Sequence, residues 1–332
     1  MTDDTGMADD PKAEGPRHSV ATVGPMRARI RQTELVKPFR PPPQTGWRKP
    51  LHRLTRINLG PSPTERAWAD LERRCRTNLR GTYLIAVMQC KGGASKTTTT
   101  IGVGQALAHY RTDKIVAIDA NPACGNLADR VDEQATGSWW HLLTDQNLDH
   151  YSDFRFHLGR DSDTGLEVLA SDSDDRVLTG PELAEAWSRL SRQFPVGLMD
   201  CGNMLNDEVT KVMLELVDAV VVVSTTAVDG AAGAEETCNW LINHGYPHLV
   251  RSAVVVISNP TNVTAGRAVR ALHEDFARAV RAVHAVPYDP HLHEACAIRR
   301  DRLRPATWRA FVEVAASVAD GFPGASDKDA QR

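Results

Sequence analysis

A nine-residue segment, from Cys90 to Thr98, places glycines beside lysines and threonines in a spacing that favours phosphate binding. It reads Cys-Lys-Gly-Gly-Ala-Ser-Lys-Thr-Thr and lies between an apolar run and a helical stretch of small residues. Free backbone N–H groups at a helix start, with the positive end of the helix dipole, form an anion site. We expect Lys96 to reach the β- and γ-phosphates of a nucleotide and the Thr97 hydroxyl to bind Mg²⁺. A glycine-rich turn with chance Lys and Thr residues is the alternative.

Two aspartates strengthen the prediction of a nucleotide site. Asp119 and Asp200 each end a short apolar run that follows the loop in the sequence. In phosphate-loop proteins a carboxylate at such a strand end holds the magnesium ion or its water shell. We therefore expect Thr97, Asp119 and Asp200 to form a Mg²⁺ site. The residues expected to contact the nucleotide from the loop are Gly92, Gly93, Ala94, Ser95, Lys96, Thr97 and Thr98.

The elements that must position these residues alternate along the chain from residue 83 onward. Short apolar runs predict strands at 83–89, 114–119, 166–170, 196–200, 219–224 and 253–258. Helical patterns lie at 97–110, 181–194, 231–244, 265–280 and 305–319. The runs of three valines at 221–223 and 254–256 are typical of strands that are buried on both faces. The pattern predicts an α/β fold of three layers, with a doubly wound, mostly parallel sheet and ligands at the carboxyl ends of its strands.

Charged residues are unevenly distributed along the 332 residues, although the net charge is only -3. Residues 11–80 hold 16 Lys/Arg and 5 Asp/Glu, so the rest of the chain is acidic. We predict a disordered Pro-rich arm over 1–45, a basic extension over 46–80 that packs on the core, the nucleotide-binding domain over 81–322, and a disordered tail over 323–332. A basic arm favours an acidic or polyanionic partner, and an arm without a partner is the alternative.

Other features exclude several classes of protein. No stretch approaches the ~20 apolar residues of a membrane span, and the acidic N-terminus does not resemble a secretory signal. The six cysteines are widely spaced without a metal-finger pattern, which favours reduced thiols and a cytoplasmic location. His291 and His293 form an HxH pair without an evident third metal ligand, so we interpret them as a surface pair at a helix start.

The motifs together resemble the MinD/ParA family of ATP-binding proteins. The loop 91–98 resembles the family's deviant Walker A motif, residues 119–126 resemble its switch segment, and residues 200–202 resemble the end of its Walker B strand. The resemblance covers residues 81–320 and implies ATP and Mg²⁺ as cofactors. It also implies that Lys91 is the catalytic lysine that reaches the partner's phosphates in a nucleotide-dependent homodimer.

The same resemblance implies contacts to the adenine base. Asn259 ends a predicted strand where the family places its base-contacting asparagine. Pro287 and Asp289 belong to a segment that is similar to the family's late Pro-x-Asp loop beside the base.

Two positions depart from the family pattern. Ser95 replaces the usual glycine before the loop lysine, and its Cβ could crowd the loop or demand a different backbone angle. Asn121 replaces an aspartate that orients the attacking water in the family, and an amide cannot accept a proton. We therefore expect Ser95 to weaken ATP binding without abolishing it, and Asn121 to slow hydrolysis. Lys91, Lys96 and Asn121 are the residues expected to take part in catalysis.

A narrower resemblance links the chain to EspI-type proteins of type VII (ESX) secretion loci. It rests on segments 46–48, 54–60 and 125–131. This implies an accessory or regulatory role in secretion, with a secretion-apparatus partner bound through residues 1–80 and no direct membrane anchor. Two alternatives stay open, namely a DNA-partitioning ParA-type ATPase and a non-catalytic scaffold with a degenerate nucleotide site. The acidic body disfavours nucleic-acid binding without excluding it.

Overall fold

The computed structural model describes residues 42, 48–56, 58–121, 125–172, 176–262 and 265–323. The predicted arm over 1–45 lies almost entirely outside these residues, as does the predicted tail after residue 323. The chain divides into two units, Met1–Ser62 and Pro63–Arg332. In the first unit the described part contains helix α2 (Arg48–Thr55). The second unit contains the sheet and is the subject of the rest of this section.

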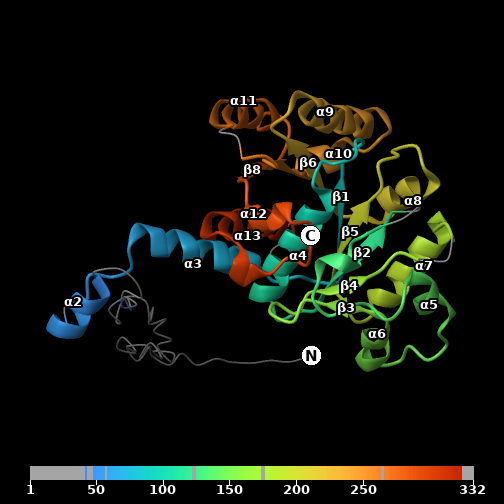
Figure 1. The fold of residues 1–332 in the computed structure, drawn as a ribbon, viewed down its shortest axis with the longest axis horizontal. Helices are drawn as coiled ribbons and strands as arrows, with labels where there is room; N and C mark the ends of the chain where they lie inside the picture. The colour runs from blue at the N-terminus through green and yellow to red at the C-terminus, as the bar shows by residue number, and fades with distance from the viewer. Residues whose placement is uncertain are drawn as a thin grey trace, which may run out of the picture. The chain divides into compact units, whose positions relative to one another are not determined.

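One sheet of eight strands runs through the second unit in the order β3-β4-β2-β5-β1-β6-β7-β8 (Figure 1). The strands are β1 (Tyr83–Met88), β2 (Ile115–Ala120), β3 (Gly159–Arg160), β4 (Glu167–Leu169), β5 (Val196–Cys201), β6 (Ala219–Thr225), β7 (Val254–Ser258) and β8 (Ala282–Val286). Every neighbouring pair is parallel except β3 and β4. Both faces of β1, β2, β5, β6 and β7 are buried, as their unbroken apolar sequences predict.

Helices cover both faces of the sheet. They are α3 (Pro63–Cys75), α4 (Lys96–Tyr110), α5 (Trp139–Thr144), α6 (Tyr151–His157), α7 (Gly180–Leu190), α8 (Glu208–Leu216), α9 (Val228–Asn243), α10 (Pro247–Ser252), α11 (Gly266–Phe276), α12 (Pro290–His293) and α13 (Pro305–Ala319), with 3-10 turns η1 (Ala128–Arg130) and η2 (Arg300–Arg302). One core joins α3, α4 and α13 to the sheet, and the other joins α5 to α10 to its opposite face. The predicted three-layer, mostly parallel α/β fold is confirmed.

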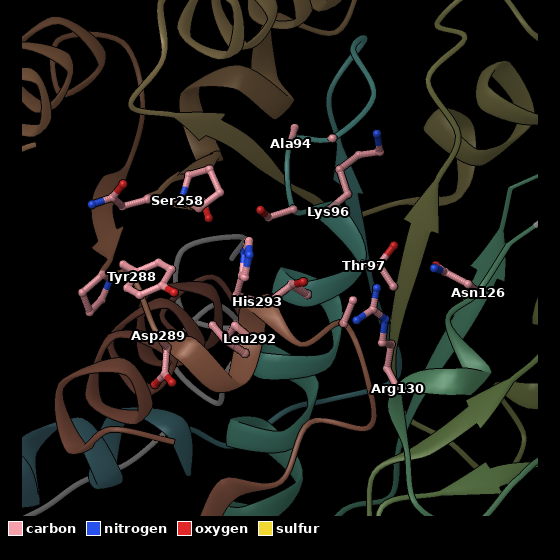
Figure 2. A pocket seen from close by; sticks show the side chains of 17 residues that line it. Ala94, Lys96, Thr97, Asn126, Arg130, Ser258, Tyr288, Asp289, Leu292 and His293 are labelled. Atoms are coloured by element: carbon pink, nitrogen blue, oxygen red, sulfur yellow. The ribbon is translucent and has the colours of Figure 1, made fainter. Parts of the chain in front are cut away.

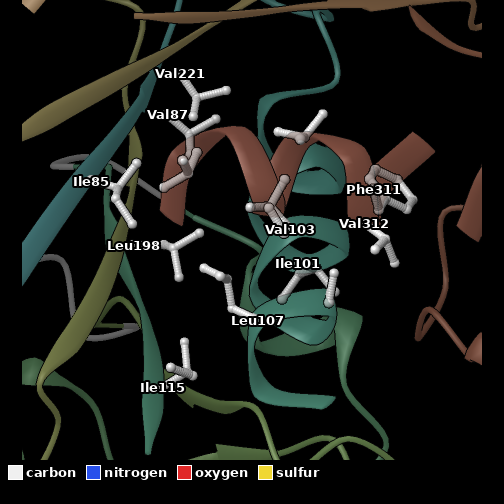
Figure 3. Packing of buried hydrophobic residues seen from close by; sticks show 14 of the residues in the cluster. Ile85, Val87, Ile101, Val103, Leu107, Ile115, Leu198, Val221, Phe311 and Val312 are labelled. Atoms are coloured by element: carbon white, nitrogen blue, oxygen red, sulfur yellow. The ribbon is translucent and has the colours of Figure 1, made fainter. Parts of the chain in front are cut away.

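The helix that follows the phosphate loop is held tightly from behind. Figure 3 shows Ile101, Val103 and Leu107 of α4 among side chains of the sheet and of α13. A Cβ at Gly102 would lie 2.4 Å from the ring of Phe311, so glycine permits the close approach of the two helices. This packing fixes the N-terminus of α4, and with it the loop, relative to the sheet.

Helix α3 packs on the same side of the domain. Arg74 forms an ion pair of 2.7 Å with Asp320 at the end of α13, and Cys75 donates to the backbone oxygen of Val312. The second half of the predicted basic extension therefore belongs to the second unit. Helix α3 begins at Pro63. Proline is favoured at a first helical position because the N–H group of that residue would have no partner within the helix.

Several elements differ from the sequence-based expectation. The pattern did not indicate α8 or β8, and α7 and α11 end at Leu190 and Phe276 rather than at 194 and 280. Short elements such as β8 depend on packing against their neighbours, so local pattern indicates them weakly. Among the described helices none is long and apolar enough to cross a membrane.

Candidate functional site

The phosphate loop connects the central strand β1 to α4. Its backbone turns through two left-handed positions, Gly93 with φ of 74° and Ser95 with φ of 68°. The amide of Cys90 donates to the Thr237 hydroxyl at 3.1 Å, which ties the start of the loop to α9. Ala94 is buried inside the loop. The first free amides of α4 therefore follow a loop that is anchored at both ends, as an anion site requires.

Ser95 adopts a left-handed backbone angle, a conformation that glycine takes without strain. This conformation costs an L-residue such as serine about 1–2 kcal/mol, because the Cβ crowds the backbone. We expect Ser95→Gly to raise the free energy of unfolding by about 1 kcal/mol, since it relieves this strain. Chemical denaturation measures the change, with Ser95→Ala as the control because alanine retains the Cβ. A less stable Ser95→Gly variant would contradict a strained loop.

Asp119 and Asp200 are direct register partners on the neighbouring strands β2 and β5. The hydroxyl of Thr97 donates to the Asp200 carboxylate at 2.6 Å. Asp119 accepts backbone N–H groups of Asn121 and Leu127, both at 3.2 Å. The three predicted Mg²⁺ ligands therefore come from β2, β5 and the start of α4. Two carboxylates and a hydroxyl form an oxygen set that suits Mg²⁺, so the residues fit the implied ion.

Both carboxylates are buried, and this shifts their ionisation. Burial, with the charge of Asp200 as the second cause, raises the pKa of Asp119 to about 7. Burial also raises the pKa of Asp200 to about 6, although Thr97 and Lys96 oppose the shift. A Cβ at Gly125 would lie 1.8 Å from an Asp119 oxygen, so glycine there lets the chain pass over the carboxylate. Such a pair is well suited to exchange protons for a divalent cation.

The raised pKa values predict how stability changes with pH in the absence of Mg²⁺. The folded state holds protons that the unfolded carboxyls, with a pKa of 3.8, have already released. The binding of these protons stabilises the folded state. The stabilisation is complete below about pH 4 and is lost as the pH rises through 6 and 7. We expect Asp119→Asn to remove a few kcal/mol of the difference in unfolding free energy between pH 5 and pH 8. Urea unfolding at both pH values measures it.

Addition of Mg²⁺ provides the control for that measurement. At pH 8 the ion should stabilise the wild type more than Asp119→Asn, because only the wild type presents both carboxylates. An identical pH dependence in wild type and variant would contradict the assignment of these shifts.

The two loop lysines have different surroundings. Lys96 is buried, and its ammonium donates to the Lys91 carbonyl at 3.3 Å and to the side-chain oxygen of Asn203. Burial lowers the pKa of Lys96, and the charge of Asp200 opposes this. Lys91 instead forms a 2.5 Å ion pair with Asp229 in the first turn of α9, and the hydrogen bond raises the pKa of Lys91. The Lys91 ammonium is therefore bound to α9 of its own chain and is not directed at the anion site of the phosphate loop.

A cavity of about 320 Å³ opens beside the loop (Figure 2). Its walls are residues 93–98, 258–260 and 287–289, together with Asn126, Arg130, Leu292, His293 and Ala295. The carboxyl ends of β7 and β8 supply the wall opposite the loop. The predicted base-contacting residues Asn259, Pro287 and Asp289 thus share one cavity with the predicted phosphate-binding residues from Gly93 to Thr98.

Other predicted residues lie outside this lining. They are Lys91, Gly92, Asp119, Asn121 and Asp200. Asn121 directly follows β2 and is half-buried, and the next three residues lie outside the described part of the chain. Asp289 lines the cavity, but its carboxylate accepts the amides of His291 at 3.1 Å and Arg304 at 2.8 Å. Its carboxylate therefore fixes the backbone of the wall.

The structure gives several residues a place at the site that the sequence did not assign to them. Asn203 and Asp229 hold the two lysines, while Arg130, Tyr288 and His293 line the cavity. His293 belongs to the HxH pair, which does begin a helix, α12. The expectation of a surface pair is wrong for His291, which is buried. Only the HxH spacing could have directed attention to His293.

A metal role for His291 conflicts with its hydrogen bonds. Its Nε2 accepts the Arg299 amide at 2.9 Å, so its Nδ1 carries the proton and donates to Glu294 at 3.0 Å. Glu294 and Cys296 lie close enough to complete a three-residue group. Since both ring nitrogens are already used, this group is better explained as the support of the α12 loop.

Comparison with known proteins gives the family. The sequence profile of the CobQ/CobB/MinD/ParA nucleotide-binding domain matches residues 85–299, well over half of the chain. The chain belongs to this family. The matched MinD/ParA segment includes the phosphate loop, both aspartates and the base-side loops, so the predicted MinD/ParA resemblance is confirmed.

Individual relatives of this MinD/ParA-type chain agree. The ESX-1 secretion-associated protein EspI of Mycobacterium tuberculosis is 40% identical over 284 residues, which cover 84% of this chain and 42% of EspI. The chain thus matches less than half the length of that relative. The predicted likeness to EspI-type proteins is confirmed.

Solved structures of MinD and ParA proteins share the fold. A ParA family ATPase from Chlorobium tepidum has a TM-score of 0.58 at 11% identity, over 71% of this chain and 98% of that one. The septum site-determining protein MinD from Pyrococcus horikoshii, complexed with Mg-ADP, has a TM-score of 0.53 at 18% identity, over 70% of this chain and 94% of that one. At these identities the likeness concerns the fold alone.

Proposed function

We propose that this MinD/ParA-type chain binds ATP with Mg²⁺, hydrolyses it slowly, and acts as a nucleotide-dependent accessory or regulator of type VII (ESX) secretion. The observation that carries the proposal is the single cavity that joins the phosphate loop to the ends of β7 and β8. Its volume of about 320 Å³ falls within the usual range of roughly 300–1,000 Å³ for small-molecule sites.

The arrangement supports a phosphate chain along the loop and a base at the far wall. Lys96 and the α4 amides supply positive charge at one end, with Thr97, Asp119 and Asp200 beside them for the Mg²⁺ ion. Asn259, Pro287 and Tyr288 at the other end offer an amide and two flat apolar surfaces to a base. When bound, Mg²⁺ would neutralise charge on the phosphates.

Slow hydrolysis follows from two features of the chain. Asn121 stands where the family carries an aspartate, and its amide can hold a water molecule but cannot accept a proton. Lys91, the lysine that would neutralise charge on a partner's phosphates, is paired with Asp229 in its own chain. A nucleotide-dependent homodimer would require this ion pair to open. We therefore expect that ATP binding leads to a long-lived ATP-bound state.

Thermal unfolding with ATP–Mg²⁺ tests the binding proposal. A ligand that binds only the folded state at 100 times its Kd adds about 2.7 kcal/mol of stability. We expect the melting temperature to rise with ATP–Mg²⁺ and to rise less with ATP in EDTA. No rise with millimolar ATP–Mg²⁺ would overturn the proposal and leave a scaffold with a degenerate site.

The proposed role in secretion is supported by the likeness to EspI and by the basic N-terminal segment. A cytoplasmic location, where ATP is available, is part of the same proposal. Affinity capture from cells that contain an ESX apparatus tests it, comparing the full chain with one that begins at Pro63. The shorter chain retains α3, which packs on α13. We expect the full chain to capture secretion-apparatus proteins and the shorter chain to lose them. Salt-sensitive capture of DNA instead would favour a partitioning protein.

A further inference from the structure

Arg130 is a buried cation that the role described so far does not use. It ends the 3-10 turn η1 and is only 9% exposed. It lines the nucleotide cavity, and Figure 2 shows its guanidinium directed toward Thr97. Its Nε is buried without a hydrogen-bond partner. Within the described ranges, no ion pair or side-chain hydrogen bond involves Arg130.

An unpaired buried guanidinium costs free energy unless an anion compensates it. Arg130 is near enough to Asp200 for its charge to lower the pKa of that carboxyl. The two Asp200 oxygens, however, accept hydrogen bonds from the hydroxyls of Thr97 at 2.6 Å and Thr100 at 3.3 Å. The described part of the protein therefore supplies no direct counter-ion.

The backbone of Arg130 is held from two sides. Its amide donates to the Leu127 carbonyl at 3.1 Å, and its carbonyl accepts the Ile298 amide at 2.9 Å. A buried side chain on a backbone that is fixed in this way loses less freedom when it binds a ligand than an exposed one would, so its contacts contribute more to affinity. Arg130 also approaches the cavity from the β2 side, whereas Lys96 approaches from α4.

We propose that Arg130 binds the phosphate chain of the nucleotide from within the same chain. This inference rests on the proposed nucleotide function and names a further residue for it. A guanidinium is planar and presents paired N–H donors that match two phosphate oxygens. A guanidinium is a donor without an acceptor site, so Arg130 contributes charge and hydrogen bonds to the bound phosphates.

The test uses the full chain with Arg130→Gln and Arg130→Lys. Dissociation constants are measured for ATP–Mg²⁺ and for inorganic tripolyphosphate, which lacks base and ribose. We expect Arg130→Gln to weaken both ligands about 10- to 100-fold, as loss of a hydrogen-bonded charge on a phosphate does. Arg130→Lys should lose less, because it retains the charge without the paired donors. Arg299→Gln is the matched control, since Arg299 is an exposed arginine outside the cavity lining.

Unfolding of the ligand-free variants separates binding from structure. Removal of an uncompensated buried cation should leave the melting temperature unchanged or raise it. Unchanged affinity in Arg130→Gln, or a loss for ATP without one for tripolyphosphate, overturns the inference while the proposed function stands. A drop in the ligand-free melting temperature that accounts for the lost affinity assigns Arg130 a structural role and also overturns it. A wild type that binds no ATP overturns both proposals.

Discussion

Lys96→Ala is expected to weaken ATP–Mg²⁺ binding by about 100-fold or more. Lys96 is the buried cation at the start of α4, and its ammonium is held within the loop by the Lys91 carbonyl and by Asn203. Each hydrogen bond to a charged group contributes about 1.5–3 kcal/mol, so the loss of two phosphate contacts reaches this range. Isothermal titration calorimetry of wild type and variant measures the change directly.

Lys211→Ala is the matched control for this experiment, because Lys211 is an exposed lysine on α8. It should bind ATP–Mg²⁺ as the wild type does. The fold should survive Lys96→Ala, since the side chain that loses its partner, Asn203, is exposed and can bind water. Equal affinities in the wild type and a folded Lys96→Ala variant would show that the cavity beside α4 is not the nucleotide site.

Asn121→Asp is expected to raise the ATP turnover rate at least ~10-fold. A carboxylate that accepts a proton in the transition state typically contributes 10²- to 10⁴-fold. The lower figure allows for Asp119 close by, whose charge resists a second one two residues away. Steady-state release of phosphate at saturating ATP measures the rate for both proteins.

Asn147→Asp is the control for that substitution, since it adds the same charge at an exposed position outside the cavity. It should leave the rate unchanged. Rapid hydrolysis by the wild type that Asn121→Asp does not increase would contradict the proposed cause of slow turnover.

Local sequence was sufficient for the central part of the site. The phosphate loop follows a strand and opens a helix, and the aspartates stand at the ends of two apolar runs. Parallel strands bring such ends to one edge of the sheet, so Asp119 and Asp200 meet as register partners although 81 positions separate their numbers. Apolar strands that are buried on both faces are also the elements that sequence pattern indicates most clearly.

The remaining contacts depend on tertiary structure and leave no local pattern. Asp229 pairs with Lys91 across 138 positions, and Asn203 binds Lys96 across 107. An aspartate at a helix start and an asparagine in a loop are common, so the sequence around Asp229 and Asn203 does not indicate these contacts. Arg130 lay inside a segment that the sequence singled out for its family likeness, but its burial beside Thr97 emerges only when β2 and α4 are placed together.

Ser95 and Asp289 show how residue type can mislead about role. The sequence indicated a backbone conflict at Ser95, and the structure accommodates it through a left-handed angle. Asp289 lies at the predicted wall, yet two backbone amides occupy its carboxylate. In both cases the family motif predicts the location, and the hydrogen bonds determine what the side chain can do.

A single-turnover experiment tests most directly the claim that this chain holds ATP without rapid hydrolysis. Excess protein with Mg²⁺ is mixed with labelled ATP, and bound nucleotide and released phosphate are followed in the same samples. The account predicts that ATP binds to the wild type and stays intact while Asn121→Asp converts it to ADP. Failure of the wild type to retain ATP, or its conversion to ADP as fast as in Asn121→Asp, would contradict the account.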